Sequence, residues 1–83
     1  GGGMRLDKYL KVSRLIKRRS VANEACGAGR VSLNGKPAKP GAEVRPGDIL
    51  ELGFGEKRIR VEVLSTQEHA ARADAPAMYK QLE

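Results

Sequence analysis

Aromatic residues are scarce in this chain, which has no Trp, one Phe and two Tyr among 83 residues. Its core must therefore come from Leu, Val, Ile and Ala, and a domain of this size buries only a modest fraction of its surface. We do not expect a large internal ligand cavity. Stacking of bases on exposed aromatic rings is also disfavoured as a mode of nucleic-acid binding.

Cysteine and histidine are equally scarce, with one residue of each. Cys26 cannot form an internal disulfide, and one Cys with one His cannot build a metal site. Cys26 falls on the apolar face of a predicted helix, so we interpret it as a buried core thiol. His69 lies in a polar tail and is expected at the surface. The sequence predicts no metal, no cofactor and no enzymatic activity.

Long apolar runs are missing as well. No stretch approaches the roughly 20 residues that a membrane helix needs. No signal peptide is evident, because the longest apolar run near the start, Leu15-Ile16, is flanked by charge. Residues 1–3, all Gly, are interpreted as a cloning remnant ahead of a natural Met4. We expect one cytoplasmic, monomeric domain with neither a membrane partner nor a small-molecule substrate.

Positive charge, in contrast, is abundant and concentrated. The chain has 16 Lys and Arg against 10 Asp and Glu, a net charge of +6. The segment 5–19 holds seven basic residues against Asp7 alone, so it carries as much net charge as the whole chain. The simpler interpretation is that these charges only form a solvent-exposed face. The excess of basic over acidic residues nevertheless favours phosphate binding. The seven are Arg5, Lys8, Lys11, Arg14, Lys17, Arg18 and Arg19.

Two short helices are predicted in the first third of the chain. Residues 5–12 place Leu6, Tyr9 and Leu10 on one stripe, and Leu15-Ile16 then anchor a connecting turn. Residues 19–28 form the second helix, whose apolar face is Val21, Ala22, Ala25 and Cys26. Basic residues at its start oppose the helix dipole, at a few tenths of a kcal/mol each. A helix start with converging cations is a good phosphate site.

The remaining sequence predicts a small antiparallel sheet, with strands at 30–33, 49–52 and 57–64. Asn34-Gly35 is a strong hairpin signal, and Pro46-Gly47 should reverse the chain. The segment 53–56 is a hairpin turn rather than a phosphate loop, because no helix follows it. The fold class is therefore α+β, a helix pair packed on a small antiparallel sheet. In the tail 65–83, Met78, Tyr79 and Leu82 allow a short amphipathic helix, with a frayed end as the alternative.

A family resemblance runs through residues 4 to about 64. Its motifs are Arg5-Leu6-Asp7-Lys8-Tyr9-Leu10, Ser13-Arg14, Arg18-Arg19-Ser20-Val21-Ala22, Gly29-Arg30-Val31-Ser32-Leu33-Asn34-Gly35 and Val44-Arg45-Pro46-Gly47-Asp48. Together they resemble the RNA-binding domain named after ribosomal small-subunit protein four, the S-four domain with its alpha-L fold. The resemblance implies an RNA-facing surface of Arg5 and Lys8 in the first helix, Arg14, Lys17, Arg18 and Arg19 in the bend and second-helix start, and Lys36 in the following loop.

Two short bacterial groups within that family remain as candidates. The segment 11–19 and the tail piece Ala77-Met78-Tyr79 are similar to the RqcP type of ribosome-associated quality control. That resemblance implies binding to large-subunit rRNA and tRNA on an obstructed large ribosomal subunit that carries peptidyl-tRNA. It also implies support of C-terminal alanine tailing of the stalled chain, together with an RqcH-type tailing factor.

Three alternatives stay open. The heat-shock protein fifteen type is a ribosome-recycling RNA-binding protein that usually has a longer basic extension. A protein-interaction adaptor would use the sheet face with Met78, Tyr79 and Leu82, and its binding would respond little to salt. Asp7 could be a catalytic acid, but a carboxylate favoured by the helix dipole, which braces Arg14 or Arg18, is the simpler interpretation.

Overall fold

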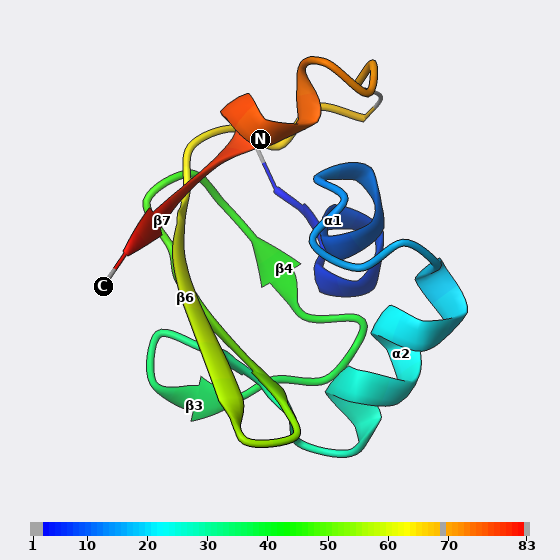
Figure 1. Ribbon diagram of the computed structural model, residues 1–83, viewed down its shortest axis with the longest axis vertical. Helices are drawn as coiled ribbons and strands as arrows, with labels where there is room; N and C mark the ends of the chain where they lie inside the picture. The colour runs from blue at the N-terminus through cyan, green and yellow to red at the C-terminus, as the bar shows by residue number, and fades with distance from the viewer. Residues whose placement is uncertain (1–2, 69, 83) are drawn as a thin grey trace.

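The computed structural model describes residues 3–68 and 70–82, so the expectation for His69 lies outside the described residues. The helix pair and the antiparallel strands confirm the α+β class (Figure 1). In chain order the elements are β1 (Met4–Arg5), α1 (Leu6–Val12), α2 (Arg19–Gly27), β2 (Val31–Leu33), β3 (Lys36–Pro37), β4 (Glu43–Val44), β5 (Ile49–Phe54), β6 (Lys57–Val63), the 3-10 helix η1 (Ala75–Met78) and β7 (Tyr79–Leu82).

The larger sheet has five strands in the order β3-β2-β5-β6-β7, and all of its neighbours are antiparallel. A second ladder of two strands joins β1 to β4 and so ties the N-terminus to the middle of the chain. Figure 1 shows α1 and α2 together on one side of the strands. The two-residue length of β3 agrees with Pro37 as its last residue, and Pro40 lies in the irregular segment between β3 and β4.

Asn34 and Gly35 form the predicted hairpin turn between β2 and β3. Both have positive φ, 52° and 88°, as a type I′ turn requires. Asn34 also fixes the turn to β5, because its side-chain oxygen accepts the backbone N–H of Ile49 at 2.9 Å. The turn therefore sets the register between β2 and β3 and the position of Lys36, the first residue of β3.

The core lies between the helix pair and the inner face of the sheet. Leu6, Tyr9 and Leu10 are fully buried, which confirms the apolar stripe of α1. In α2, the prediction that Val21 belongs to the apolar face is wrong, since 45% of this residue is exposed. The inward face of this short helix is narrow and is occupied by Ala22, Ala25 and Cys26. The bulkier Val21 therefore lies outside it. The inward side chains of the sheet are Val31, Leu50, Leu52, Val61 and Val63.

The tail forms neither the amphipathic helix that Met78, Tyr79 and Leu82 allowed nor the frayed end that was the alternative. Tyr79–Leu82 is instead a strand that pairs with β6, with Tyr79 opposite Val63. Without it, β6 would present an unpaired edge, and the ladder satisfies those backbone groups. The helical part is confined to η1, with Pro76 near its start.

The Tyr9 hydroxyl joins α1 to this tail by donating a buried hydrogen bond of 2.7 Å to the Met78 carbonyl oxygen. Tyr9→Phe is expected to lower the free energy of unfolding by about 1 kcal/mol. The loss stays small because the N–H groups of Leu64 and Ser65 also bond this carbonyl. Urea denaturation measures it, with Tyr79→Phe as the control at a half-buried ring with no hydroxyl partner among the described residues. A larger loss from the control would contradict this account.

Candidate nucleic-acid interface

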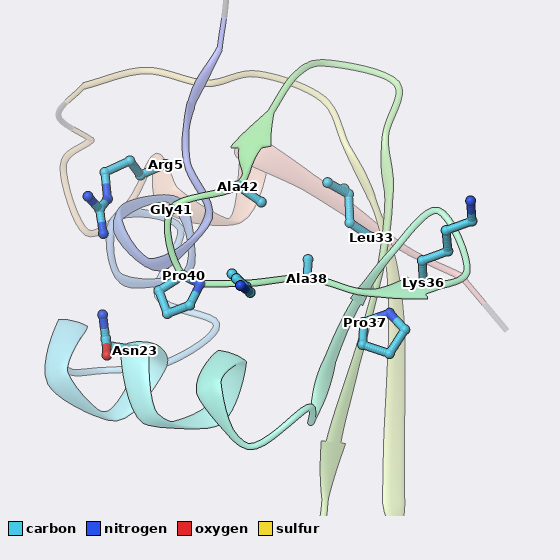
Figure 2. A pocket seen from close by; sticks show the side chains of 10 residues that line it. Arg5, Asn23, Leu33, Lys36, Pro37, Ala38, Pro40, Gly41 and Ala42 are labelled. Atoms are coloured by element: carbon cyan, nitrogen blue, oxygen red, sulfur yellow. The ribbon is translucent and has the colours of Figure 1, made fainter.

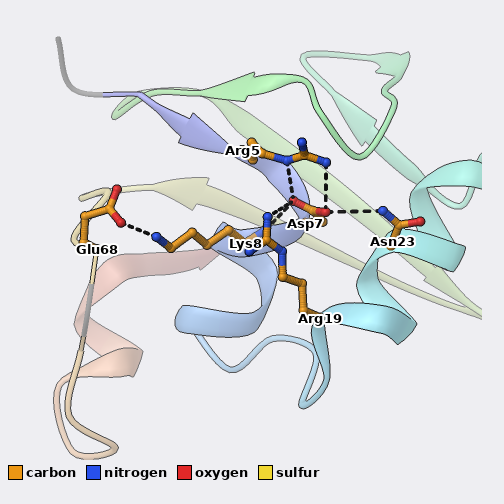
Figure 3. Close-up of polar contacts among 6 residues, drawn as sticks. All are labelled: Arg5, Asp7, Lys8, Arg19, Asn23 and Glu68. Atoms are coloured by element: carbon orange, nitrogen blue, oxygen red, sulfur yellow. Dashed lines mark hydrogen bonds and ion pairs between the residues drawn. The ribbon is translucent and has the colours of Figure 1, made fainter.

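Asp7 is the centre of a polar cluster between the two helices (Figure 3). Its carboxylate is 3% exposed and accepts two hydrogen bonds from Arg5, at 3.2 and 3.3 Å. Arg19 and Asn23 of α2 donate to it at 3.4 and 3.3 Å, and the backbone N–H of Lys8 donates at 2.8 Å. We call these five residues the Asp7 cluster. Its carboxylate oxygen Oδ1 holds two guanidinium groups, one from the residue that precedes α1 and one from the first residue of α2.

Burial alone would raise the pKa of Asp7, and it is the largest single effect on this carboxyl. The hydrogen bonds from Arg5, Asn23 and Lys8, with the positive charge of Arg19, together outweigh burial and lower the pKa below 3.8. Asp7 is therefore ionised at neutral pH, as the structural interpretation requires. Its partners differ from the expected Arg14 and Arg18, because Asp7 faces Arg5 of β1 and the residues Arg19 and Asn23 of α2 rather than the bend.

The bend between the helices carries Arg14, Lys17 and Arg18, which we call the bend cations. All three are exposed, and none has a hydrogen bond or ion pair through its side chain within residues 3–68 and 70–82. Arg14 sits in the left-handed region at φ 63°, which costs a non-glycine residue roughly 1–2 kcal/mol. Backbone bonds from Arg14 to Lys11 and from Ile16 to Leu10 hold this conformation.

The start of α2 lies directly after the bend cations. Its N-cap residue is Arg18, which makes no capping hydrogen bond through its side chain, and its first turn has no acidic residue. The positive end of the helix dipole therefore adds to the charge of the bend. An anion bound here would interact with both the dipole and the cations, so the phosphate site predicted from the sequence stays a prediction at this place.

Arg5 and Lys8, which the resemblance assigned to the RNA-facing surface, both have ion-pair partners within the protein. Arg5 precedes the first helix, in β1, where it is both the N-cap residue of α1 and a partner of Asp7. Lys8 is within α1, but its ammonium forms an ion pair with Glu68 of the tail (Figure 3). Part of the charge of both residues is therefore already compensated, so they contribute less to an anion-binding surface than the bend cations.

Lys36 is the first residue of β3 and lies far from the bend, at one end of an open groove of about 770 Å³ (Figure 2). Arg5 and Asn23 line the opposite end. Lys39 also lines this groove, and our sequence prediction missed it. The signal was present, because Lys36-Pro37 and Lys39-Pro40 repeat a Lys-Pro pair three residues apart, the period of an extended proline-type helix.

A metal site, a membrane-spanning helix and an accessible thiol are all absent from the described part of the chain. Within it, no group of three or more His, Cys, Asp and Glu could hold a metal ion. None of the described helices is long and apolar enough to cross a membrane. Cys26 is buried in the core of the protein, as predicted.

Burial, with a smaller effect from the negative charge of Asp7, raises the pKa of the Cys26 thiol to about 11. At pH 8 we expect Ellman's reagent to react about a hundredfold more slowly with the folded protein than with the same chain in concentrated urea, because the folded thiol is both protonated and inaccessible. The unfolded chain is its own control. Equal rates in the two states would show that Cys26 is accessible.

Comparison with known proteins gives consistent matches. The S4 domain family model matches residues 4–50. The RQC P-site tRNA stabilizing factor of Halalkalibacterium halodurans is 48% identical over 93% of this chain and 88% of its own. That of Bacillus subtilis is 49% identical over 92% and 88%. The trimeric structure of Vibrio cholerae heat shock protein 15 has a TM-score of 0.88 at 28% identity, over 96% of this chain and 82% of that one.

The fold and the exposed cations thus define a small S4-type module, the class to which the sequence motifs pointed. The chain belongs to the S4 domain family and, within it, to the family of RQC P-site tRNA stabilizing factors.

Proposed function

We propose that this protein is an RNA-binding accessory factor of ribosome-associated quality control. It binds the obstructed large ribosomal subunit and its peptidyl-tRNA in the cytoplasm, and it supports alanine tailing of the stalled chain by an RqcH-type factor. The observation that carries the proposal is the set of bend cations Arg14, Lys17 and Arg18, which have no side-chain partner among the described residues, in a chain whose relatives are named for tRNA stabilization in the P site.

The geometry supports phosphate contacts more than base reading. The bend cations and the uncapped start of α2 offer charge and backbone N–H groups on one part of the surface. Arg5 and Arg19 remain about half exposed although Asp7 holds them. Their guanidinium groups are therefore fixed in place before RNA binds, which reduces the entropy lost on binding. Such an array suits folded RNA, which proteins recognise largely by shape and backbone.

A pull-down from cells with stalled translation tests the proposal. The tagged protein should enrich free large subunits with peptidyl-tRNA over assembled ribosomes, and the RqcH-type factor should be enriched with them. A variant with Arg14, Lys17 and Arg18 replaced by Gln should lose this enrichment. Equal recovery of assembled ribosomes and vacant subunits would contradict the quality-control role while leaving RNA binding intact.

A ribosome-recycling role of the heat-shock type is the second candidate, favoured by the similarity to heat shock protein 15. Deletion of the gene distinguishes the two roles, with alanine tails on a stalled reporter as the measurement. Lost tails support the quality-control role, whereas unchanged tails support recycling. The adaptor alternative is weakened, because Met78 is buried and Tyr79 and Leu82 are only half-exposed.

A further inference from the structure

The groove between the middle of α2, at Asn23, and the β3–β4 segment is separate from the bend. Arg5 and Asn23 stand at one end of it and Lys36 at the other (Figure 2). Its volume of about 770 Å³ is within the range of roughly 300–1,000 Å³ that small-molecule and cofactor sites occupy. Apolar side chains line it between these ends: Leu33, Pro37, Ala38, Pro40 and Ala42.

Backbone hydrogen bonds hold the floor of the groove in place. The N–H groups of Leu6 and Asp7, in the first turn of α1, donate to the carbonyl oxygens of Ala42 and Pro40 at 2.8 and 3.1 Å. Ala38 donates to the carbonyl oxygen of Val31 at 3.1 Å. Proline rings also fix φ at two positions of this segment. The groove is therefore formed before any ligand binds, and little ordering entropy opposes binding.

The charged residues at the groove all have one sign. Arg5, Lys36 and Lys39 line it, and no Asp or Glu is among its lining residues. Lys36 and Lys39 are exposed, without an ion pair in the described part of the chain. An apolar floor between cations matches a ligand with a flat apolar centre and negative charge on both sides.

We propose that the groove binds one unpaired nucleotide of RNA, an inference that rests on the proposed function. The base lies against the Pro and Ala side chains, and the flanking phosphates contact Lys36 at one end and Arg5 at the other. Bases of loops and bulges are unstacked and can be inserted in this way, and guanidinium planes can stack on them. The groove thus gives the protein an RNA contact distinct from the bend cations.

Gly41 offers a direct test. A Cβ added there would meet only the Arg5 guanidinium, at 3.9 Å, and its φ is not in the left-handed region. Gly41→Leu should therefore fill the groove beside Arg5 without changing charge or straining the backbone. Gly27→Leu is the matched control, since Gly27 is outside the groove and a Cβ there would meet nothing within 4 Å.

The measurement is fluorescence anisotropy with two RNA hairpins that differ only by a single-nucleotide bulge. Wild type and Gly27→Leu should bind the bulged hairpin about tenfold more tightly, because only that RNA can bury a base. Gly41→Leu should bind both hairpins as wild type binds the paired one. Thermal melting of each variant verifies the fold, and if Gly41→Leu proves unfolded, Pro37→Ala, which removes part of the floor, should halve or further reduce the preference.

The outcomes separate this inference from the proposed function. Equal binding of both hairpins by wild type, or an unchanged preference in folded Gly41→Leu, would overturn the groove assignment while RNA binding stands. Failure to bind either hairpin at low salt would overturn both. An acidic peptide that competes with RNA in wild type but not in Gly41→Leu would assign the groove to a protein partner and would also overturn the nucleotide site.

Discussion

Replacing Arg14, Lys17 and Arg18 together by Gln is expected to lower the affinity for RNA by about a hundredfold near physiological salt. Each side chain is exposed and free of any intramolecular partner in the described residues, so its full charge is available to a phosphate. Each neutralised phosphate contributes roughly 0.7–0.9 to the slope of log affinity against log salt. The slope should therefore become shallower by about two to three units, and a salt titration of binding measures both effects.

The control is a triple variant with the same change in charge. Lys57, Arg72 and Lys80 are exposed, are on the sheet and the tail, and have no ion pair among the residues described. Replacing them by Gln also removes three positive charges but leaves the bend intact. Its affinity should fall by less than about tenfold. If the two triple variants lose equal affinity, the net charge rather than the bend surface binds RNA.

Asp7→Asn is expected to have the second largest effect, here on stability, with a loss of roughly 1–3 kcal/mol in the free energy of unfolding. The amide would leave Arg5 and Arg19 close together without the negative charge that holds them. Both guanidinium groups are about half exposed, so water relieves part of the cost. Urea denaturation measures the loss. Glu51→Gln, at a half-exposed carboxylate near Arg58 and Arg60, is the control and should change stability by less than about 1 kcal/mol.

The pH dependence of stability provides an independent check on Asp7. Its pKa is lowered in the folded state, so its contribution is complete above the unfolded value near 3.8. That contribution is lost as the pH falls through the lowered folded value, because the unfolded chain then binds the proton first. Asp7→Asn should flatten the acid limb of the stability curve. An unchanged acid limb would show that other carboxylates cause it.

Several local features of this protein were predictable because their causes are local. The apolar stripe of α1 follows from the spacing of Leu6, Tyr9 and Leu10, and the turn at Asn34-Gly35 follows from its need for positive φ. The concentration of charge in residues 5–19 is likewise a property of the chain. These local features are what allowed the fold class and a polyanionic partner to be predicted from the sequence.

Contacts between segments that are distant in the sequence could not be predicted from local patterns. Tyr79–Leu82 has a helix-compatible apolar pattern, yet it forms a strand because β6 offers an open edge. Lys8 forms an ion pair with Glu68, which is 60 residues further along the chain, and no local sequence pattern predicts that pair. The role of each cation therefore depends on which partner the fold brings to it.

The division between sequence and tertiary structure is clearest in the basic segment. The number of cations in this segment, and the presence of Asp7 as its one acidic residue, follow directly from the order of residues along the chain. The pairing within the segment depends on the folded structure: Asp7 holds Arg5 and Arg19, while Arg14, Lys17 and Arg18 have no partner in residues 3–68 and 70–82. The reason is physical: charge adds along a chain, but the pairing of charges depends on distances of a few ångströms that packing alone sets.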